Sequence, residues 1–138
     1  MSLLPIPASN KKCDVQLFCF SHAGGGASSY YSWGKLVPEW LEVTAIQLPG
    51  HETRLSEPLI NNWPELISGI SAEIVNHITK PFAFFGHSMG ALIALEVTMH
   101  LVRKEICAPS SLFLSGRNGP AAQSIFPRIS HESDDIFL

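Results

Sequence analysis

The feature that most limits the possible folds of this chain is an alternation of short apolar segments with segments of helical periodicity. Four apolar runs with the length of a buried strand cover residues 15–20, 43–48, 82–85 and 111–115. Between them we expect helices at residues 29–37, 63–78 and 89–102. Strands that alternate with helices pair in parallel through right-handed crossovers, and helices cover both faces of the sheet. The sequence therefore predicts an α/β fold, with a parallel sheet and flanking helices.

Turn and cap residues mark the ends of several of these elements. The strand at residues 43–48 stops at Pro49-Gly50, and a polar loop is expected over residues 51–58. In the helix at residues 63–78, apolar residues recur at spacings of three and four. Asn62 precedes that helix and is placed to cap its first turn. In a parallel sheet the loops that follow the strands meet at one edge, so functional residues are expected there.

Size and composition allow one domain and exclude two classes of function. The 138 residues, 46% of them hydrophobic, suffice for one buried core. Nine Lys and Arg residues against twelve Asp and Glu residues leave a net charge of -3, so no nucleic acid partner is expected. No apolar run approaches the roughly 20 residues of a membrane span. The N-terminal segment does not follow the pattern of a secretory signal, and we expect a cytoplasmic protein without a membrane partner.

The cysteines are an odd set of three without a CxxC spacing, namely Cys13, Cys19 and Cys107. This pattern favours buried thiols over a disulfide framework. No cluster of His, Cys and Asp has the spacing of metal ligands. We therefore expect neither a metal site nor another cofactor.

The strongest functional signal is Gly86-His87-Ser88-Met89-Gly90, which matches G-x-S-x-G between a predicted strand and a predicted helix. Ser88 would occupy a tight, strained turn, and the two glycines would let neighbouring backbone approach closely. Gly86, His87 and Gly90 are therefore expected to support the turn. The helix start directs backbone N–H groups, above all that of Met89, to where an oxyanion would form. The motif predicts Ser88 as a nucleophile of acyl transfer, and the alternative is a chance glycine-serine turn.

A second informative segment, His22-Ala23-Gly24-Gly25, follows the first predicted strand. A loop of this kind supplies a second oxyanion N–H in serine hydrolases, and Ala23 is the candidate donor. We interpret His22 as a residue that supports the loop, and Gly24 and Gly25 as parts of the same support. A phosphate-binding loop is disfavoured, because the segment lacks both the G-x-G-x-x-G spacing and a Gly-Lys-Ser/Thr ending.

Four segments in this order, FCFSHAGGGASSY, QLPGHETR, FFGHSMGALIALE and LFLSGR, resemble the type II thioesterases. These are stand-alone α/β-hydrolases that accompany polyketide, nonribosomal peptide and fatty acid synthases, and the medium-chain fatty acid synthase thioesterase is similar. The resemblance spans roughly residues 15–138 and implies hydrolysis of acyl groups from the phosphopantetheine arm of an acyl or peptidyl carrier protein. It implies Ser88 as nucleophile, with Met89 and Ala23 as oxyanion donors. One departure is His51, where the family usually has Arg.

The general base and acid of a triad are not identified by the sequence. In α/β-hydrolases they follow the nucleophile in the order Ser, then Asp or Glu, then His. His100 lies twelve residues further along the same predicted helix, about 18 Å from Ser88, and is too distant to be the base. The remaining candidates form a polar cluster of His131, Glu132, Asp134 and Asp135. The resemblance instead implies that the triad Asp and His lie beyond this segment.

Length points to the same expectation, since single α/β domains of this type commonly have about 200 to 250 residues. We expect residues 1–138 to form the N-terminal portion of an α/β-hydrolase domain, with about four strands and without the lid and last strands. A complete chain is expected to be a monomer. Two alternatives to a thioesterase stay open, an inactive half-domain that acts as a binding module and an esterase or lipase for oxygen esters.

Overall fold

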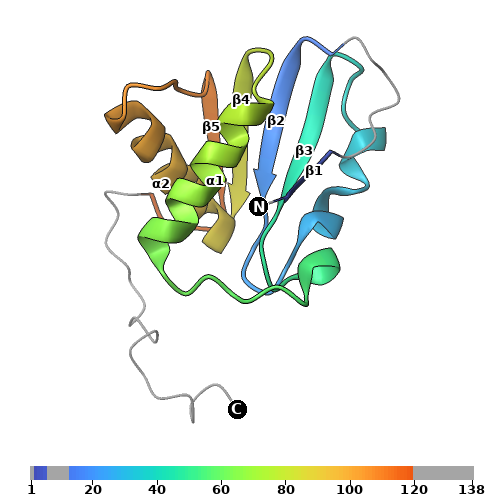
Figure 1. The fold of residues 1–138 in the computed structure, drawn as a ribbon. Coiled ribbons are helices and arrows are strands. Elements are labelled where there is room, and N and C mark those ends of the chain that lie inside the picture. Colours follow the sequence, from blue (N-terminus) through green and yellow to red (C-terminus); the bar gives the residue numbers. More distant parts are fainter. Residues whose placement is uncertain (1, 6–12, 120–138) are drawn as a thin grey trace.

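The computed structural model, shown in Figure 1, describes residues 2–5 and 13–119 of the 138-residue chain. Within these ranges five strands form one sheet, which consists of β1 (Ser2–Pro5), β2 (Val15–Phe20), β3 (Leu41–Gln47), β4 (Phe82–His87) and β5 (Ser111–Ser115). Two α-helices accompany them, α1 (Trp63–His77) and α2 (Met89–Arg103). Three short 3-10 helices complete the described elements, η1 (Ala27–Tyr30), η2 (Trp33–Lys35) and η3 (Glu52–Arg54).

The strand order is β1-β3-β2-β4-β5, and the pairs β2–β3, β2–β4 and β4–β5 are parallel. The predicted α/β fold with four parallel strands and flanking helices is therefore confirmed. The prediction did not include β1, which pairs antiparallel with β3 along one edge of the sheet. This segment contains Pro5, and a proline within a short apolar run weakens a strand prediction because it cannot donate to the ladder.

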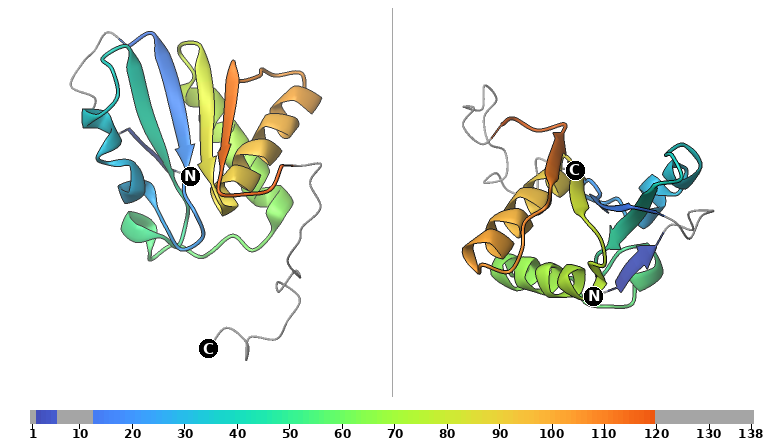
Figure 2. Two further views of the ribbon diagram at one scale, coloured as in Figure 1. Left: turned by 180° about the vertical axis from the view of Figure 1, so that it is seen from behind. Right: turned by 90° about the horizontal axis from the view of Figure 1, so that it is seen from above.

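Each face of the sheet has its own apolar core, as expected for a sheet covered on both sides. Figure 2 shows α1 and α2 together on one of these faces. On one face α1 and α2 pack on strand residues that include Phe18, Phe20 and Phe84. On the other face Tyr30 of η1 and the partly buried Trp33 of η2 pack on the intervening strand residues. Side chains that alternate along a strand point to opposite faces. Continuous apolar runs such as VQLFCF are therefore explained by burial on both faces.

The strand register aligns the carboxyl ends of the parallel strands. Phe20 of β2 lies opposite Gly86 of β4, and His87 of β4 lies opposite Ser115 of β5. Cys19 pairs with Ala45 of β3, so β3 ends at the same level. The loops after these four strands thus share one edge of the sheet, here called the carboxyl edge, as expected from the sequence.

The helix expected at residues 29–37 is wrong. This segment instead forms η1 and η2, whose turns close by i to i+3 bonds such as Leu36 N–H to Trp33 O at 2.9 Å. Serine, tyrosine and glycine are modest helix formers, and Pro38 ends the segment before a longer helix can develop. The loop expected at residues 51–58 also contains a helical turn, η3.

The predictions for α1 and α2 are confirmed to within one residue at each end. The Asn62 side chain accepts a hydrogen bond from the Glu65 N–H at 3.0 Å, which is the predicted N-cap. Neither helix, nor any other in the described part of the chain, has the length and hydropathy needed to cross a bilayer. β5 is the last strand of the sheet in the described residues, and the side chain of its Phe113 is 54% exposed.

The predicted burial of the three thiols is confirmed for Cys13 and Cys19, whereas Cys107 is partly exposed. Burial raises the pKa of the Cys19 thiol to about 12, so this residue stays protonated and unreactive near neutral pH.

The two-faced core makes a testable prediction about α1. Ile74 is 0% exposed and Val75, its neighbour, is 37% exposed. Ile74→Ala should lower the free energy of unfolding by about 2–5 kcal/mol, because it removes buried apolar surface and leaves a cavity. Val75→Ala should cost less than about 1 kcal/mol. Urea unfolding followed by circular dichroism measures both, and equal losses would contradict this assignment of the buried face.

Candidate active site

Ser88 lies between β4 and α2 in the conformation that the motif predicts. Its φ of 54° and ψ of -114° are rare for a residue with a side chain, and it is the N-cap residue of α2. Such a conformation costs on the order of 1–3 kcal/mol and persists only where the surroundings enforce it. The strained turn places the partly buried Ser88 side chain at the carboxyl edge.

The two glycines of the motif explain how the turn is enforced. A Cβ atom at Gly86 would overlap the backbone of Gly90 and Ala91, and one at Gly90 would overlap the carbonyl groups of Phe20 and Ser21. The obstructing atoms are backbone atoms and cannot move aside as a side chain would. Gly86 and Gly90 are therefore required by the close approach of α2 to the ends of β2 and β4.

The end of β5 supports the same turn. This contact between β5 and the turn was not predicted from the sequence. The Ser88 N–H donates to the Ser115 carbonyl oxygen at 2.9 Å, and His87 Nδ1 lies 3.1 Å from Ser115 Oγ. The His87 ring covers Gly116, where a Cβ atom would collide with it. His87 thus ties the turn to β5, a structural contact consistent with the supporting role expected for it.

The loop after β2, residues 21–28, carries the second predicted group of site residues and is here called the oxyanion loop. The Gly25 N–H donates to the His22 carbonyl oxygen at 3.0 Å, and Gly24 has a φ of 73°. The His22 ring lies against Gly25, where a Cβ atom would overlap it, and its centroid is 6.3 Å from that of His87. The oxyanion loop and the Ser88 turn are therefore neighbours.

The two predicted oxyanion donors lie on these neighbouring segments. Ala23 is exposed in the oxyanion loop, and Met89 is the first residue of α2. Within residues 13–119 neither the Ala23 N–H nor the Met89 N–H donates a hydrogen bond. Both groups can therefore donate to a bound oxyanion, and their catalytic role stays a prediction.

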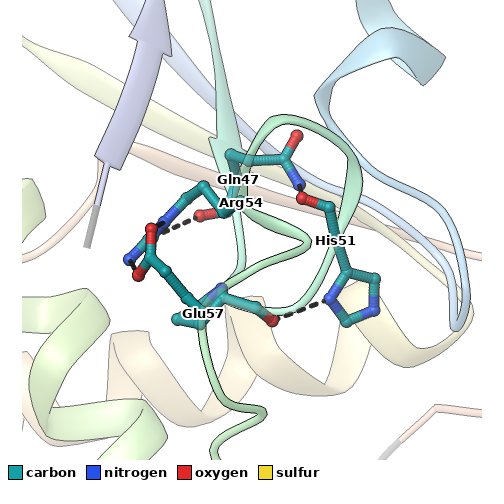
Figure 3. Close-up of polar contacts among 5 residues, drawn as sticks. Gln47, His51, Arg54 and Glu57 are labelled. Carbon is teal, nitrogen blue, oxygen red and sulfur yellow. Dashed lines mark hydrogen bonds and ion pairs between the residues drawn. The ribbon is translucent and has the colours of Figure 1, made fainter.

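A third loop, between β3 and α1, completes the carboxyl edge. Figure 3 shows that Gln47, His51, Arg54 and Glu57 form one polar network in it. Arg54 Nη1 donates to the Gln47 carbonyl oxygen at 3.0 Å, and Arg54 Nε donates to Glu57 at 2.6 Å. This pairing raises the pKa of the Arg54 guanidinium and lowers that of the Glu57 carboxyl. The network fixes the shape of the loop.

His51, the departure from the family pattern, belongs to this network through its backbone as well as its ring. Its Nδ1 lies 2.9 Å from the Pro49 carbonyl oxygen, and its own carbonyl oxygen accepts a bond from Gln47 Nε2 at 3.2 Å. The second contact uses only the backbone of His51, so it does not require a particular residue type at position 51.

The hydrogen bonds of the described residues do not identify a general base for Ser88. Between residues 13 and 119 no histidine ring forms a hydrogen bond with the Ser88 hydroxyl. The weak candidates His131, Asp134 and Asp135, and their neighbour Glu132, lie outside the described residues. His100 is on the last turns of α2, as expected. In the same part of the chain no cluster of three His, Cys, Asp or Glu residues could hold a metal ion.

Comparison with known proteins assigns a family to this arrangement. The family described as "Thioesterase domain" matches residues 15–132. The gramicidin S biosynthesis protein GrsT of Aneurinibacillus migulanus is 43% identical over 111 residues, which cover 80% of this chain and 43% of that protein. The medium-chain S-acyl fatty acid synthase thioesterase of Rattus norvegicus is 40% identical over 116 residues, covering 83% and 44%.

Among solved structures, the type II thioesterase BorB from the borrelidin biosynthetic cluster superimposes with a TM-score of 0.80 at 27% identity. The superposition covers 98% of this chain and 54% of that one. The resemblance to type II thioesterases stated from the motifs is therefore confirmed. The chain spans about half the length of the curated relatives that it matches.

The strained turn at Ser88 makes a prediction that can be tested without an activity assay. Ser88→Gly and Ser88→Ala both remove the hydroxyl, but only glycine adopts the φ of 54° without steric cost. Ser88→Gly should therefore exceed Ser88→Ala in free energy of unfolding by about 1 kcal/mol, part of the relief being offset by the greater entropy of unfolded glycine. Thermal unfolding of the two variants measures this, and a less stable glycine variant would argue against a strained turn.

Proposed function

The chain belongs to the thioesterase family, and from this premise we propose that the protein hydrolyses acyl thioesters on the phosphopantetheine arm of a carrier protein. The observation that carries the proposal is Ser88 in its strained turn, with the predicted oxyanion donors on adjoining segments. The names of the relatives connect them with gramicidin S biosynthesis and with fatty acid synthase. Both kinds of synthesis support a thioester substrate on a carrier arm.

The proposed reaction has two steps. The Ser88 oxygen attacks the thioester carbonyl carbon, its proton passes to a histidine outside residues 13–119, and a tetrahedral oxyanion forms. Collapse of this intermediate breaks the C–S bond, and the histidine gives its proton to the departing sulfur, so that the pantetheine thiol leaves and an acyl ester remains on Ser88. Water then attacks the ester in the same way, releasing the free acid and restoring the Ser88 hydroxyl.

The oxyanion would be held by the N–H groups of Ala23 and Met89. The Met89 N–H is at the start of α2, where the unpaired N–H groups and the helix dipole favour negative charge. Loss of one such donor costs about 3 kcal/mol of transition-state stabilisation in serine hydrolases. Two donors from separate segments would explain why the oxyanion loop and the Ser88 turn are built side by side.

A carrier protein is the proposed partner, because it presents the pantetheine thioester. The monomeric state and the cytoplasmic location expected from the sequence stay predictions.

The proposal predicts that Ser88→Ala in the full-length protein lowers kcat for an acyl-carrier thioester by at least about 1000-fold. The variant should bind the substrate about as well as the wild type, because the hydroxyl contributes chiefly to the reaction steps. Release of the carrier thiol, followed with a thiol-reactive dye, measures the rate.

A matched oxygen ester with the same acyl group serves as the comparison substrate. A thioesterase should have the higher kcat/KM on the acyl carrier, whereas faster cleavage of the oxygen ester would favour an esterase or lipase. Equal hydrolysis of the thioester by the wild type and Ser88→Ala would refute the proposed mechanism.

A further inference from the structure

We propose that Gln47 and Glu52 are positioning residues, which hold the oxyanion loop at the distance from Ser88 that turnover requires. The inference rests on the proposed function, since it assigns the Ala23 N–H its catalytic role. Gln47 is the last residue of β3, and Glu52 is the first residue of η3 in the loop that follows. Their side-chain hydrogen bonds go to residues 27, 28 and 51 and not to Ser88. They would act through the backbone of residues 27 and 28.

Gln47 is a fully buried polar side chain with both ends of its amide in use. It is 0% exposed at the end of β3. Its Oε1 accepts the Ala27 N–H at 2.9 Å, and its Nε2 donates to the His51 carbonyl oxygen at 3.2 Å. Burial of an amide is favourable only when its hydrogen bonds are made. The amide therefore joins the end of the oxyanion loop to the loop after β3.

Glu52 makes a second connection next to the first. Its carboxylate accepts the Ser28 N–H at 3.1 Å and also accepts a hydrogen bond from the Ser28 hydroxyl. Glu52 has a φ of 40°, and its side chain fills the space that a Cβ atom at Gly26 would need. An unfavourable backbone conformation at a residue with a side chain indicates that its contacts compensate for the strain.

The composition of the oxyanion loop shows why it needs external attachment. Gly24, Gly25 and Gly26 follow one another, and glycine has more backbone freedom than any other residue. At one end the loop is continuous with β2. At the other end, Ala27 and Ser28 are bonded to Gln47 and Glu52. Without these bonds, the position of the Ala23 N–H would depend on three consecutive glycines.

The loop after β3 is rigid enough to act as the support. Arg54 bonds to the Gln47 carbonyl oxygen and to Glu57, and His51 contacts the Pro49 carbonyl oxygen (Figure 3). The buried hydroxyl of Tyr30 adds a bond of 2.7 Å to the Phe20 carbonyl oxygen, which connects η1 to the end of β2. The residues to which the oxyanion loop is bonded, Gln47 and Glu52, thus lie in a loop that is itself held by hydrogen bonds.

The chain contains a matched control for Gln47. Gln16 is also buried, at 5% exposure, and it also uses both ends of its amide. Its Nε2 donates to the His77 carbonyl oxygen at 3.1 Å, and its Oε1 accepts the Thr79 N–H at 3.0 Å. These bonds fix the connection between α1 and β4, near the start of β2 and away from the carboxyl edge.

The test compares Gln47→Met with Gln16→Met in the full-length protein. Both substitutions should lower Tm by similar amounts, because each removes two hydrogen bonds of a buried side-chain amide. We expect Gln47→Met to lower kcat for the acyl-carrier thioester by about 10- to 100-fold with little change in KM. Gln16→Met should keep kcat within about twofold of the wild type, which separates positioning from general loss of stability.

A pair of substitutions at Glu52 provides an independent readout if Gln47→Met does not fold. Glu52→Ala should lower kcat in the same way. Glu52→Gln should recover most of it, because a carboxamide oxygen can accept the Ser28 N–H and its NH2 group can donate to the Ser28 hydroxyl.

The failure of this inference is distinguishable from the failure of the proposed function. Ser88-dependent hydrolysis by the wild type, combined with unchanged kcat in Gln47→Met or in Glu52→Ala, would overturn the positioning role alone. Equal losses of kcat in Gln47→Met and Gln16→Met would also overturn it. Absence of Ser88-dependent hydrolysis in the wild type would overturn the proposed function, and the positioning role with it.

Discussion

The close approach of α2 to the end of β2 is the contact on which the rest of the site depends. Gly90 lies against the Phe20 and Ser21 carbonyl groups, and Gly86 lies against Gly90, with no space for a Cβ atom at either glycine. Because α2 is held this close to β2 and β4, Ser88, which connects β4 to α2, takes its strained conformation. The Ser115 carbonyl oxygen then fixes the Ser88 N–H from the neighbouring strand. Packing of the sheet thus sets the position of the Ser88 hydroxyl.

The remaining loops of the carboxyl edge are arranged around this turn by polar contacts. Gln47 and Glu52 hold the end of the oxyanion loop, and the loop that carries them is braced by Arg54. A site that stabilises charge in a transition state needs donors that are fixed before the substrate arrives. The buried Gln47 amide and the exposed Glu52 carboxylate, each bonded to a backbone N–H group, provide this fixing, while the glycines of the oxyanion loop allow its tight path.

Most of the sheet and the strained turn at Ser88 could be predicted from the sequence, because their signals are local. The apolar runs of β2 and β4 reflect burial on both faces, and the spacing of Gly86, Ser88 and Gly90 reflects one steric contact. The prediction of a helix at residues 29–37 was wrong because the segment forms two short 3-10 turns, from which its aromatic side chains pack against the sheet. The hydrogen bond between Gln47 and Ala27 could not be predicted from the sequence, since the two residues are twenty positions apart and meet only after folding.

Capture of an acyl-enzyme intermediate tests the central claim, covalent catalysis by Ser88, most directly. The full-length protein would be mixed with an acyl-carrier thioester, quenched in acid within the first turnover, digested and analysed by mass spectrometry. We predict that the acyl group is found as an ester on Ser88. Thioester hydrolysis without acylation, or an acyl group found on a different residue, would contradict the claim that this strained turn carries the nucleophile.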